Sequence, residues 1–195
     1  MIRLRTLAAL AAVGVVLAGC SDTKDGTPSP ASPAGQSSGA DPGTGVPPVE
    51  TPLDTARFEQ DPCSLLTSAQ AQEIAGLVKS TPDNAQGGPS CQWQDPSGFG
   101  INIGFIPNGL RNLYSQHKAG RVSYFEPVAS VAGYPGAFGA LGDVRAQGTC
   151  TLSVGVRNDL AMSVVSTLGS QRGAQSCQVV LKAAETAVTT IKGGA

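Results

Sequence analysis

Residues 150–164 read CTLSVGVRNDLAMSV, and the alternation within them governs the fold that the chain can adopt. Apolar side chains occupy every second position of residues 150–156 and again of residues 160–164, which is the period of a β-strand with one buried face. Between the two runs, Asn158 and Asp159 favour a tight two-residue turn. These residues therefore predict an antiparallel β-hairpin.

A second hairpin is predicted upstream of the first. Residues 91–94 and 99–106 both alternate apolar with polar side chains, and the Asp-Pro-Ser-Gly sequence between them is a turn signal. The segments that remain are predicted as a loop at 82–89, a mixed strand at 122–128 and a turn-rich connection at 131–136.

Three helices are predicted around these strands. Thr67 is a good N-cap, and Gln70 stands at the third helical position of a capping box, which indicates an amphipathic helix over residues 68–78. A short polar helix is predicted at 110–118, and apolar residues at steps of four and three predict a C-terminal helix over 177–191. Helix, antiparallel strands and helix in this order predict an α+β fold, a twisted antiparallel sheet with the N- and C-terminal helices packed on one face.

The N-terminus carries a targeting signal. A short basic start precedes an apolar run at residues 7–18, which is too short to span a bilayer and is typical of a secretory signal. Residues 17–20 read Leu-Ala-Gly-Cys, the bacterial lipobox pattern, in which the Cys20 thiol receives a diacylglycerol and residues 1–19 are removed. The alternative is an ordinary signal peptide with a coincidental cysteine. The pattern predicts a protein lipid-anchored through Cys20 to the outer face of the cytoplasmic membrane, in the cell envelope.

Composition divides the rest of the chain into two parts. Residues 20–56 are dense in Pro, Gly, Ser and Thr and contain few large apolar side chains, so we expect a disordered tether after the lipidated cysteine. Residues 57–195 are long enough for one hydrophobic core and form a single predicted domain. Charged residues make up 14% of the chain and the net charge is −1, with Lys and Arg scattered. Because nucleic acids require a clustered basic face, we do not expect a nucleic-acid partner.

Four cysteines remain besides Cys20, and an even number in an exported chain predicts two disulfides. Three pairings are possible. We favour Cys63–Cys91 and Cys150–Cys177, because each joins the start of a predicted helix to a nearby predicted strand. A zinc site is the competing interpretation, and the lack of a Cys-x-x-Cys motif together with a single histidine argues against it.

The sequence carries no recognisable catalytic set. A serine-type triad needs a histidine base, and His117 lies in a polar stretch without the Gly-x-Ser-x-Gly motif. The carboxylates of Asp95, Glu126, Asp143 and Asp159 fall in predicted turns or beside prolines. No phosphate-binding loop or dinucleotide fingerprint is present. We therefore predict a protein that is not an enzyme and that uses no metal or cofactor.

Aromatic residues suggest where recognition takes place. Trp93 lies two residues from Cys91 on an alternating strand, so we expect a core aromatic packed on the disulfide; a stacking platform for a carbohydrate or lipid is the alternative. Tyr134 and Phe138 lie in a segment rich in Gly and Pro and are predicted to be exposed on a loop. Because loops on a rigid scaffold often carry binding groups, these two residues are the predicted recognition surface.

Several of these blocks together resemble the DUF3558 lipoproteins of actinobacterial cell envelopes. The resemblance rests on the lipobox and tether, on Asp-Pro-Cys-Ser-Leu-Leu-Thr at 61–67, on Cys91-x-Trp93, on Val-Ala-Gly-Tyr-Pro at 131–135 and on the strand at 150–156. It covers the whole mature domain and implies a secreted, lipid-anchored α+β domain with paired cysteines. It implies no activity, because the family is named for an unknown function.

The function expected from these observations is a lipid-anchored binding or accessory module that engages a protein, a glycan or a lipid of the envelope. Two other functions remain open at this point. One is a carrier of a small molecule or lipid, which needs an apolar cavity between sheet and helices. The other is an envelope hydrolase, which would have to depend on His117.

Overall fold

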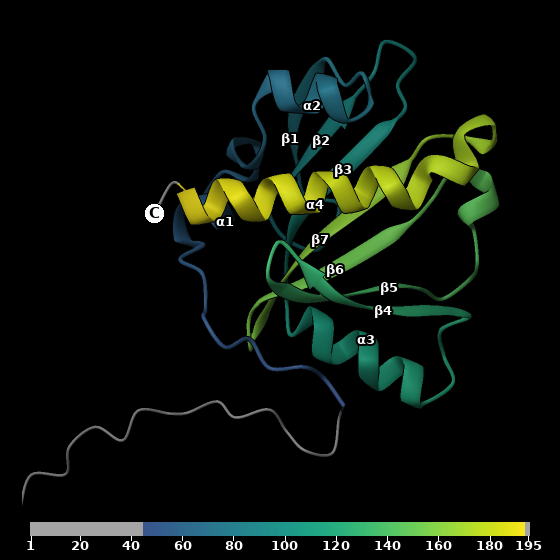
Figure 1. Cartoon of the computed structure of the whole chain (residues 1–195). Coiled ribbons are helices and arrows are strands. Elements are labelled where there is room, and N and C mark those ends of the chain that lie inside the picture. Colours follow the sequence, from purple (N-terminus) through teal and green to yellow (C-terminus); the bar gives the residue numbers. More distant parts are fainter. Residues whose placement is uncertain (1–44, 194–195) are drawn as a thin grey trace, which may run out of the picture. The chain divides into compact units, whose positions relative to one another are not determined.

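The computed structural model describes residues 45–193, which form one antiparallel sheet with helices around it (Figure 1). The predicted signal peptide, Cys20 and the tether up to residue 44 lie outside the described residues. Within residues 45–193, no helix combines the length and apolar character that crossing a membrane requires. The α-helices are α1 (Ala56–Gln60), α2 (Ser68–Ala75), α3 (Gly109–Lys118) and α4 (Ser176–Gly193), and the 3-10 helices are η1 (Pro62–Leu65), η2 (Arg145–Gln147) and η3 (Ser170–Gln175). The strands are β1 (Lys79–Asp83), β2 (Ser90–Gln94), β3 (Gly100–Pro107), β4 (Tyr124–Val131), β5 (Tyr134–Ala140), β6 (Thr151–Arg157) and β7 (Leu160–Thr167).

The sheet consists of two meanders joined at its centre. Its strand order is β1-β2-β3-β7-β6-β5-β4, and each neighbouring pair is antiparallel. The junction is the pairing of β3 with β7, which runs in register from Gly100 opposite Thr167 to Pro107 opposite Leu160. α3 follows β3 and carries the chain to β4 at the far edge, from which the second meander returns to the centre (Figure 1).

Both predicted hairpins are confirmed. β6 and β7 pair up to the two-residue turn at Asn158 and Asp159. In the β2–β3 hairpin, a carboxylate oxygen of Asp95 accepts hydrogen bonds from the backbone N–H groups of Ser97 and Phe99 at 2.8 and 3.1 Å. An Asp at this place therefore closes the turn with its own side chain, which is why Asp is favoured there.

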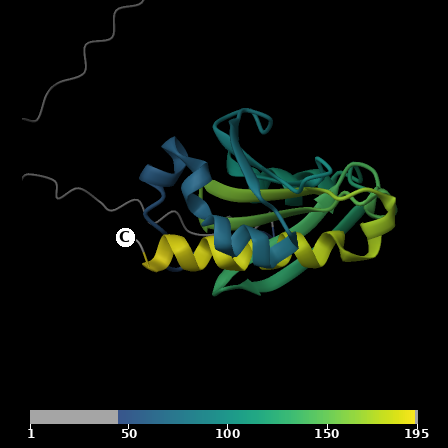
Figure 2. The ribbon, with the colours of Figure 1, turned by 90° about the horizontal axis from the view of Figure 1, so that it is seen from above.

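The main core lies between the sheet and α4. Leu152, Val154 and Val156 of β6 and Met162 and Val164 of β7 are all fully buried, because alternate residues of each strand project from the same face. α4 covers this face with the buried stripe of its amphipathic sequence, and α2 lies on the same side (Figure 2). The predicted α+β fold, with N- and C-terminal helices on one face, is confirmed.

The predicted short polar helix, now α3, packs against the opposite face of the sheet. Its buried Leu110 forms a small second cluster with Ala137 of β5 and Ala161 of β7. Leu113, one turn further on, fills the place that a Cβ on Gly139 would need. Small residues on the strands therefore allow this helix to approach closely.

α2 begins as predicted and ends earlier. The side chain of Thr67 accepts a hydrogen bond from the N–H of Gln70 at 3.2 Å, and the side chain of Gln70 accepts one from the N–H of Thr67 at 2.8 Å, so the capping box is confirmed. The helix ends at Ala75, not at residue 78, because Gly76 adopts a left-handed conformation with φ of 69° and Leu77 is fully buried.

Most of the predicted turn-rich connection at 131–136 is strand. Only Ala132 and Gly133 form the turn, both with positive φ, and β5 begins at Tyr134. β5 does not alternate apolar with polar side chains, because it has glycines at positions where neighbouring atoms leave little room for a Cβ. A Cβ on Gly136, for example, would lie 3.1 Å from the carbonyl oxygen of Ser153. β5 is therefore a strand that does not show the apolar alternation by which strands are predicted.

β1 is a second strand that the sequence pattern does not predict, and it overlaps the loop predicted at 82–89. Four of its five residues are exposed, so it lacks the alternation of a half-buried strand. Pro82 lies in β1 at one edge of the sheet, and Pro127 lies in β4 at the other edge. A proline removes an N–H that an added strand would need, so both edges are poor templates for further pairing.

The domain begins earlier than the predicted boundary at residue 57. Residues 46–55, here called the strap, lie along the folded body. Val49 is only 5% exposed, and its N–H donates to the side-chain oxygen of Asn158 at 2.9 Å. The N–H of Leu53 donates to the carbonyl oxygen of Val156 at 3.0 Å. The strap therefore belongs to the domain and not to the tether.

A charged cluster fixes the end of the strap. The buried Thr55 donates from its hydroxyl to Glu59 at 2.6 Å and accepts from the guanidinium of Arg157 at 2.6 Å. Arg157 also donates to Glu59 at 2.8 Å. The hydrogen bonds from Thr55 and Arg157 lower the pKa of Glu59 below its ordinary value. The cluster thus ties the first helix of the domain to the β6–β7 hairpin.

The favoured disulfide pairing is confirmed. Cys63–Cys91 joins η1 to β2, and Cys150–Cys177 joins the residue before β6 to the first turn of α4. Each bridge therefore fastens a helix of one face to the sheet that it covers.

Replacing both cysteines of either bridge by alanine should lower the free energy of unfolding by about 3–4 kcal/mol, because the unfolded chain regains the entropy of an open loop. The sequence separations are 28 and 27 residues, so the two double variants should lose nearly equal amounts. Urea unfolding of the non-reduced proteins measures both losses. A markedly larger loss in one variant would mean that packing around that bridge outweighs loop closure.

Candidate functional site

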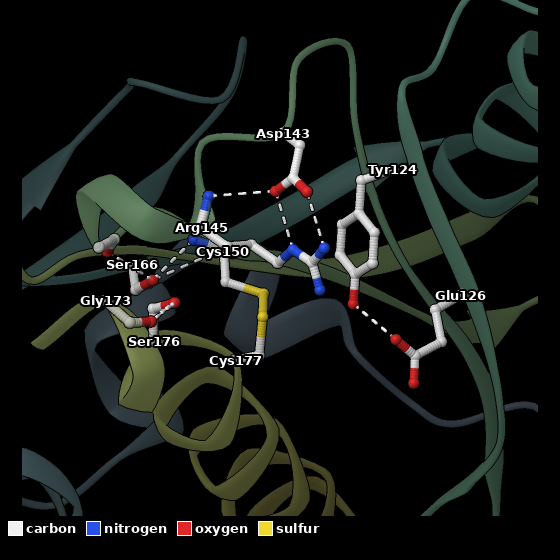
Figure 3. Close-up of a disulfide and its surroundings, with 10 residues drawn as sticks. Tyr124, Glu126, Asp143, Arg145, Cys150, Ser166, Gly173, Ser176 and Cys177 are labelled. Atoms are coloured by element: carbon white, nitrogen blue, oxygen red, sulfur yellow. Dashed lines mark hydrogen bonds and ion pairs between the residues drawn. A yellow bond between two sulfur atoms is a disulfide. The ribbon is translucent and has the colours of Figure 1, made fainter. Parts of the chain in front are cut away.

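A pocket of about 330 Å³ lies beside the Cys150–Cys177 disulfide, and we call it the Arg145 pocket (Figure 3). Five separate parts of the chain build it: the edge strand β4, strand β5, the 3-10 helices η2 and η3, and the start of α4. Its lining residues are Tyr124, Glu126, Phe138, Arg145, Gly173, Ala174, Cys177, Gln178 and Leu181.

The sheet register and the disulfide position these side chains. Glu126 of β4 pairs with Phe138 of β5, so their side chains are neighbours on the face that α4 covers. The Cys150–Cys177 bridge holds the first turn of α4 against the start of β6. The irregular segments around η2 and η3 are thereby kept at the rim of the pocket.

Tyr124 interacts with three other residues that line the pocket. The guanidinium carbon of Arg145 lies 3.7 Å from the centroid of the Tyr124 ring, in a cation–π arrangement. Phe138 stacks nearby, with ring centroids 6.5 Å apart. The Tyr124 hydroxyl donates to a carboxylate oxygen of Glu126 at 2.7 Å (Figure 3). Burial and this adjacent carboxylate raise the pKa of Tyr124 to about 12.

Arg145 is held over the ring by Asp143. The guanidinium donates two hydrogen bonds to the Asp143 carboxylate, at 2.8 and 2.7 Å, in the planar two-bond geometry that arginine favours. These hydrogen bonds lower the pKa of Asp143 to about 2 and raise the pKa of Arg145 above its ordinary value. Both groups are therefore charged across the physiological range, and Arg145 is fixed in orientation before any ligand binds.

The pocket offers a mixture of polar and apolar groups. Only one carboxylate oxygen of Glu126 receives a hydrogen bond, and the Gln178 amide has no hydrogen-bond partner among the described residues. Phe138, Leu181 and the disulfide supply the apolar part of the wall. A concave surface with a few fixed polar groups beside an apolar wall is suited to non-covalent recognition. Across residues 45–193, no three metal-ligating side chains come together.

The structure does not place the predicted recognition residues in an exposed loop. Tyr134 is 6% exposed and Phe138 is 7% exposed, and both lie on β5. Phe138 reaches the wall of the Arg145 pocket. Tyr134 lies in a separate hollow of about 300 Å³ beside the strap, where its hydroxyl donates to the carbonyl oxygen of Thr51 at 2.8 Å. The prediction of exposure is wrong because the surrounding Gly and Pro residues belong to a packed strand.

Two other residues that the sequence singles out, Trp93 and His117, lie outside the Arg145 pocket. Trp93 is 3% exposed and Cys91 is fully buried, so the expected core role of Trp93 is confirmed. His117 is exposed on α3, where its ring stacks on Phe125 with centroids 3.9 Å apart.

No local sequence pattern predicts the Arg145 pocket. In the sequence, Glu126 and Asp143 stand out only as carboxylates near predicted turns or prolines, and no pattern singles out Tyr124 or Arg145. The available signal is the Asp143-x-Arg145 spacing within an exposed Gly-containing segment, because an Asp two residues before an Arg can hold its guanidinium. The contact with Tyr124 has no such signal, since the two residues meet only in the folded sheet.

Comparison with known proteins identifies one family. A family model described as "Protein of unknown function (DUF3558)" matches residues 15–190. Neither a curated protein nor a solved structure matches the chain.

The environment of Tyr124 predicts a pH-dependent stability. The pKa of Tyr124 is raised from 10.0 to about 12, so its contribution to stability should be complete below pH 10 and should be lost as the pH rises through about 12. The ultraviolet absorbance of tyrosinate measures this pKa, and subtraction of the Tyr124→Phe titration isolates Tyr124 from the two other tyrosines. Glu126→Gln should move the pKa back toward 10. An unchanged pKa in that variant would contradict the proposed role of the carboxylate.

Proposed function

The chain belongs to the DUF3558 family, and we propose that it acts as a lipid-anchored, non-enzymatic binding or accessory module of the cell envelope, on the outer face of the cytoplasmic membrane. The observation that carries this proposal is the Arg145 pocket. Its cation, carboxylate and aromatic groups are held by one another and by a disulfide, at a surface that a partner can reach.

The rigidity of this arrangement favours binding. Asp143 orients Arg145 before any ligand arrives, and the ring of Tyr124 contacts both Arg145 and Phe138. Side chains that are already ordered lose little conformational entropy when a partner binds. The geometry is therefore that of a preformed recognition surface.

The sequence supports the anchor. The family match begins at residue 15, so it includes the lipobox at residues 17–20. Residues 21–44, between Cys20 and the first described residue, are rich in Pro, Gly, Ser and Thr, and this composition supports the proposed tether.

The two other candidate functions receive less support. Fully buried side chains occupy the interface between α4 and the sheet, so this interface does not favour a carrier of lipids. A hydrolase would need His117 near other reactive groups. His117 lies on α3, on the face of the sheet opposite to α4, whereas α4 supplies part of the Arg145 pocket.

Cys20 should carry the lipid. Cells grown with a clickable fatty acid should label the wild-type protein, and Cys20→Ala should lose the label, because the thiol is the acceptor of the diacylglyceryl group that carries the fatty acids. Ser21→Ala, a change of similar size at the neighbouring position, should keep it. Gel fluorescence of the immunoprecipitated protein measures the label. An unlabelled wild-type protein, or one found free in the culture medium, would remove the anchor from the proposal.

The pocket should contact its ligand in living cells. A photo-crosslinking phenylalanine analogue in place of Gln178, at the pocket rim, should give a defined adduct after irradiation of intact cells. The same analogue in place of Thr189, exposed on the same helix α4, is the matched control and should give none. Mass spectrometry identifies the adduct. Repeated absence of any adduct at position 178 would sink the binding role of this pocket.

A further inference from the structure

The charges that line the Arg145 pocket do not cancel. Arg145 is the one cation among the lining residues, and its guanidinium is bound to the Asp143 carboxylate at 2.7 Å, so these two charges offset each other. Glu126 is exposed and forms no ion pair within residues 45–193. One of its oxygens accepts from the neutral hydroxyl of Tyr124, and the other has no hydrogen bond in the described part of the chain (Figure 3). The unpaired charge of the pocket is therefore negative.

A second carboxylate lies next to the pocket. Gln178 and Leu181 of α4 line the pocket, and Glu185 follows Leu181 by four residues, which places it on the same side of the helix one turn further on. Glu185 is exposed and, like Glu126, has no ion pair among the described residues. Its charge adds to that of Glu126.

The basic residues near these segments do not offset the two carboxylates. Arg172, next to the lining residues of η3, is paired with Asp95 at 2.6 Å, and Lys182 of α4 is paired with Glu73 at 2.9 Å. Arg121, shortly before β4, is exposed and has no ion pair in residues 45–193, and it does not line the pocket. A ligand that enters the pocket therefore meets a carboxylate without a cationic partner.

This arrangement disfavours three classes of ligand. An anion such as a phosphate group would lie beside the Glu126 carboxylate, while Asp143 already occupies the guanidinium of Arg145. A sugar ring that stacks on an aromatic side chain needs an open aromatic face, whereas Arg145 lies over the Tyr124 ring and Phe138 is only 7% exposed. A wholly apolar ligand would cover the free oxygen of Glu126 without giving it a hydrogen bond.

A cationic group on an alkyl stem matches what the pocket offers. The free oxygen of Glu126 and the amide oxygen of Gln178 can both accept hydrogen bonds from an ammonium or guanidinium group. Leu181 and the sulfur of Cys177 supply an apolar wall for the methylene groups of the stem. At about 330 Å³, the pocket is near the small end of ligand-binding pockets, so it suits a single side chain better than a large ligand.

We propose that the Arg145 pocket binds a basic group at the end of an alkyl stem, a primary ammonium or a guanidinium, with the cation held by Glu126. The proposal rests on the proposed function, since it names the ligand chemistry of the same pocket. It also gives Asp143 a role in selectivity, because this carboxylate offsets the charge of Arg145 that would otherwise repel a cation. A Lys or Arg side chain of a protein and a small free amine share this chemistry, and the experiment in cells separates these two sources.

Nuclear magnetic resonance of the full chain in detergent tests the chemistry with small probes. Butylammonium and butylguanidinium, which carry the end groups of Lys and Arg, should shift the side-chain amide resonances of Gln178. The neutral 1-butanol and the anionic butyrate are of similar size and should bind roughly fivefold more weakly or not at all, because neither forms an ion pair with Glu126.

Two variants locate the charge that matters. Glu126→Gln removes the charge and keeps an oxygen that can accept from Tyr124, so butylammonium should bind it roughly fivefold more weakly. Glu50→Gln removes an equal charge from an exposed residue beside the strap and should leave the affinity unchanged. Equal thermal unfolding of the three proteins shows that the fold is intact. Equal binding of butylammonium and 1-butanol by the wild type, tighter binding of butyrate, or an unchanged affinity in Glu126→Gln would each overturn the proposal.

A crosslinking experiment in cells separates this proposal from the proposed function. The photo-crosslinking phenylalanine analogue replaces Ala174, an exposed residue that lines the pocket, so that Gln178 is kept. The adduct should decrease roughly fivefold in Glu126→Gln and persist in Glu50→Gln. Mass spectrometry should show either a peptide crosslinked beside a Lys or Arg, which identifies a protein as the source, or a small amine.

The outcomes in cells are distinct. An adduct that is equally abundant in Glu126→Gln, or one with a ligand that has no basic group, would leave the proposed function standing and remove the cationic ligand. Absence of any adduct at Ala174, together with absence at Gln178, would remove the proposed function and this proposal with it.

Discussion

The pairing of β3 with β7 is the constraint on which the structure depends. It joins residues 100–107 to residues 160–167 and turns two separate meanders into one sheet. Contacts this far apart along the chain cost closure entropy before they contribute any stabilisation. Once they form, the strands of both meanders share a common register, so their ends align at two sides of the domain. One side receives the strap, and the other carries the Arg145 pocket.

These two sides are stabilised in different ways. At the strap side, backbone hydrogen bonds, the buried Val49 and the charged cluster of Thr55, Glu59 and Arg157 hold an extended segment on the sheet. At the other side the chain is irregular, with two short 3-10 helices that lack a hydrogen-bonded ladder to neighbouring strands. The Cys150–Cys177 disulfide anchors this region covalently. Variable, irregular surface on a rigid scaffold is the usual arrangement of binding sites.

Sequence patterns were reliable where a structure depends on near neighbours. The two hairpins and the capping box at Thr67 each involve residues a few positions apart, and periodicity or turn chemistry reveals them. The disulfides were paired correctly because each joins a helix start to a neighbouring predicted strand. The patterns failed for β1 and β5. β1 is an exposed edge strand, and β5 contains glycines that close neighbours require, so neither shows apolar alternation.

The sequence by itself thus determined the α+β class, the local elements, the paired cysteines and the family. These features follow from the spacing of residue types along the chain and from its composition. Only the tertiary structure decided that Tyr134 and Phe138 are buried and lie in different hollows, that the domain begins with the strap, and that Tyr124 meets Arg145 and Glu126. The physical reason is the same in each case. The burial of a side chain and its partners depends on segments that folding brings from far along the chain, and no local pattern records them.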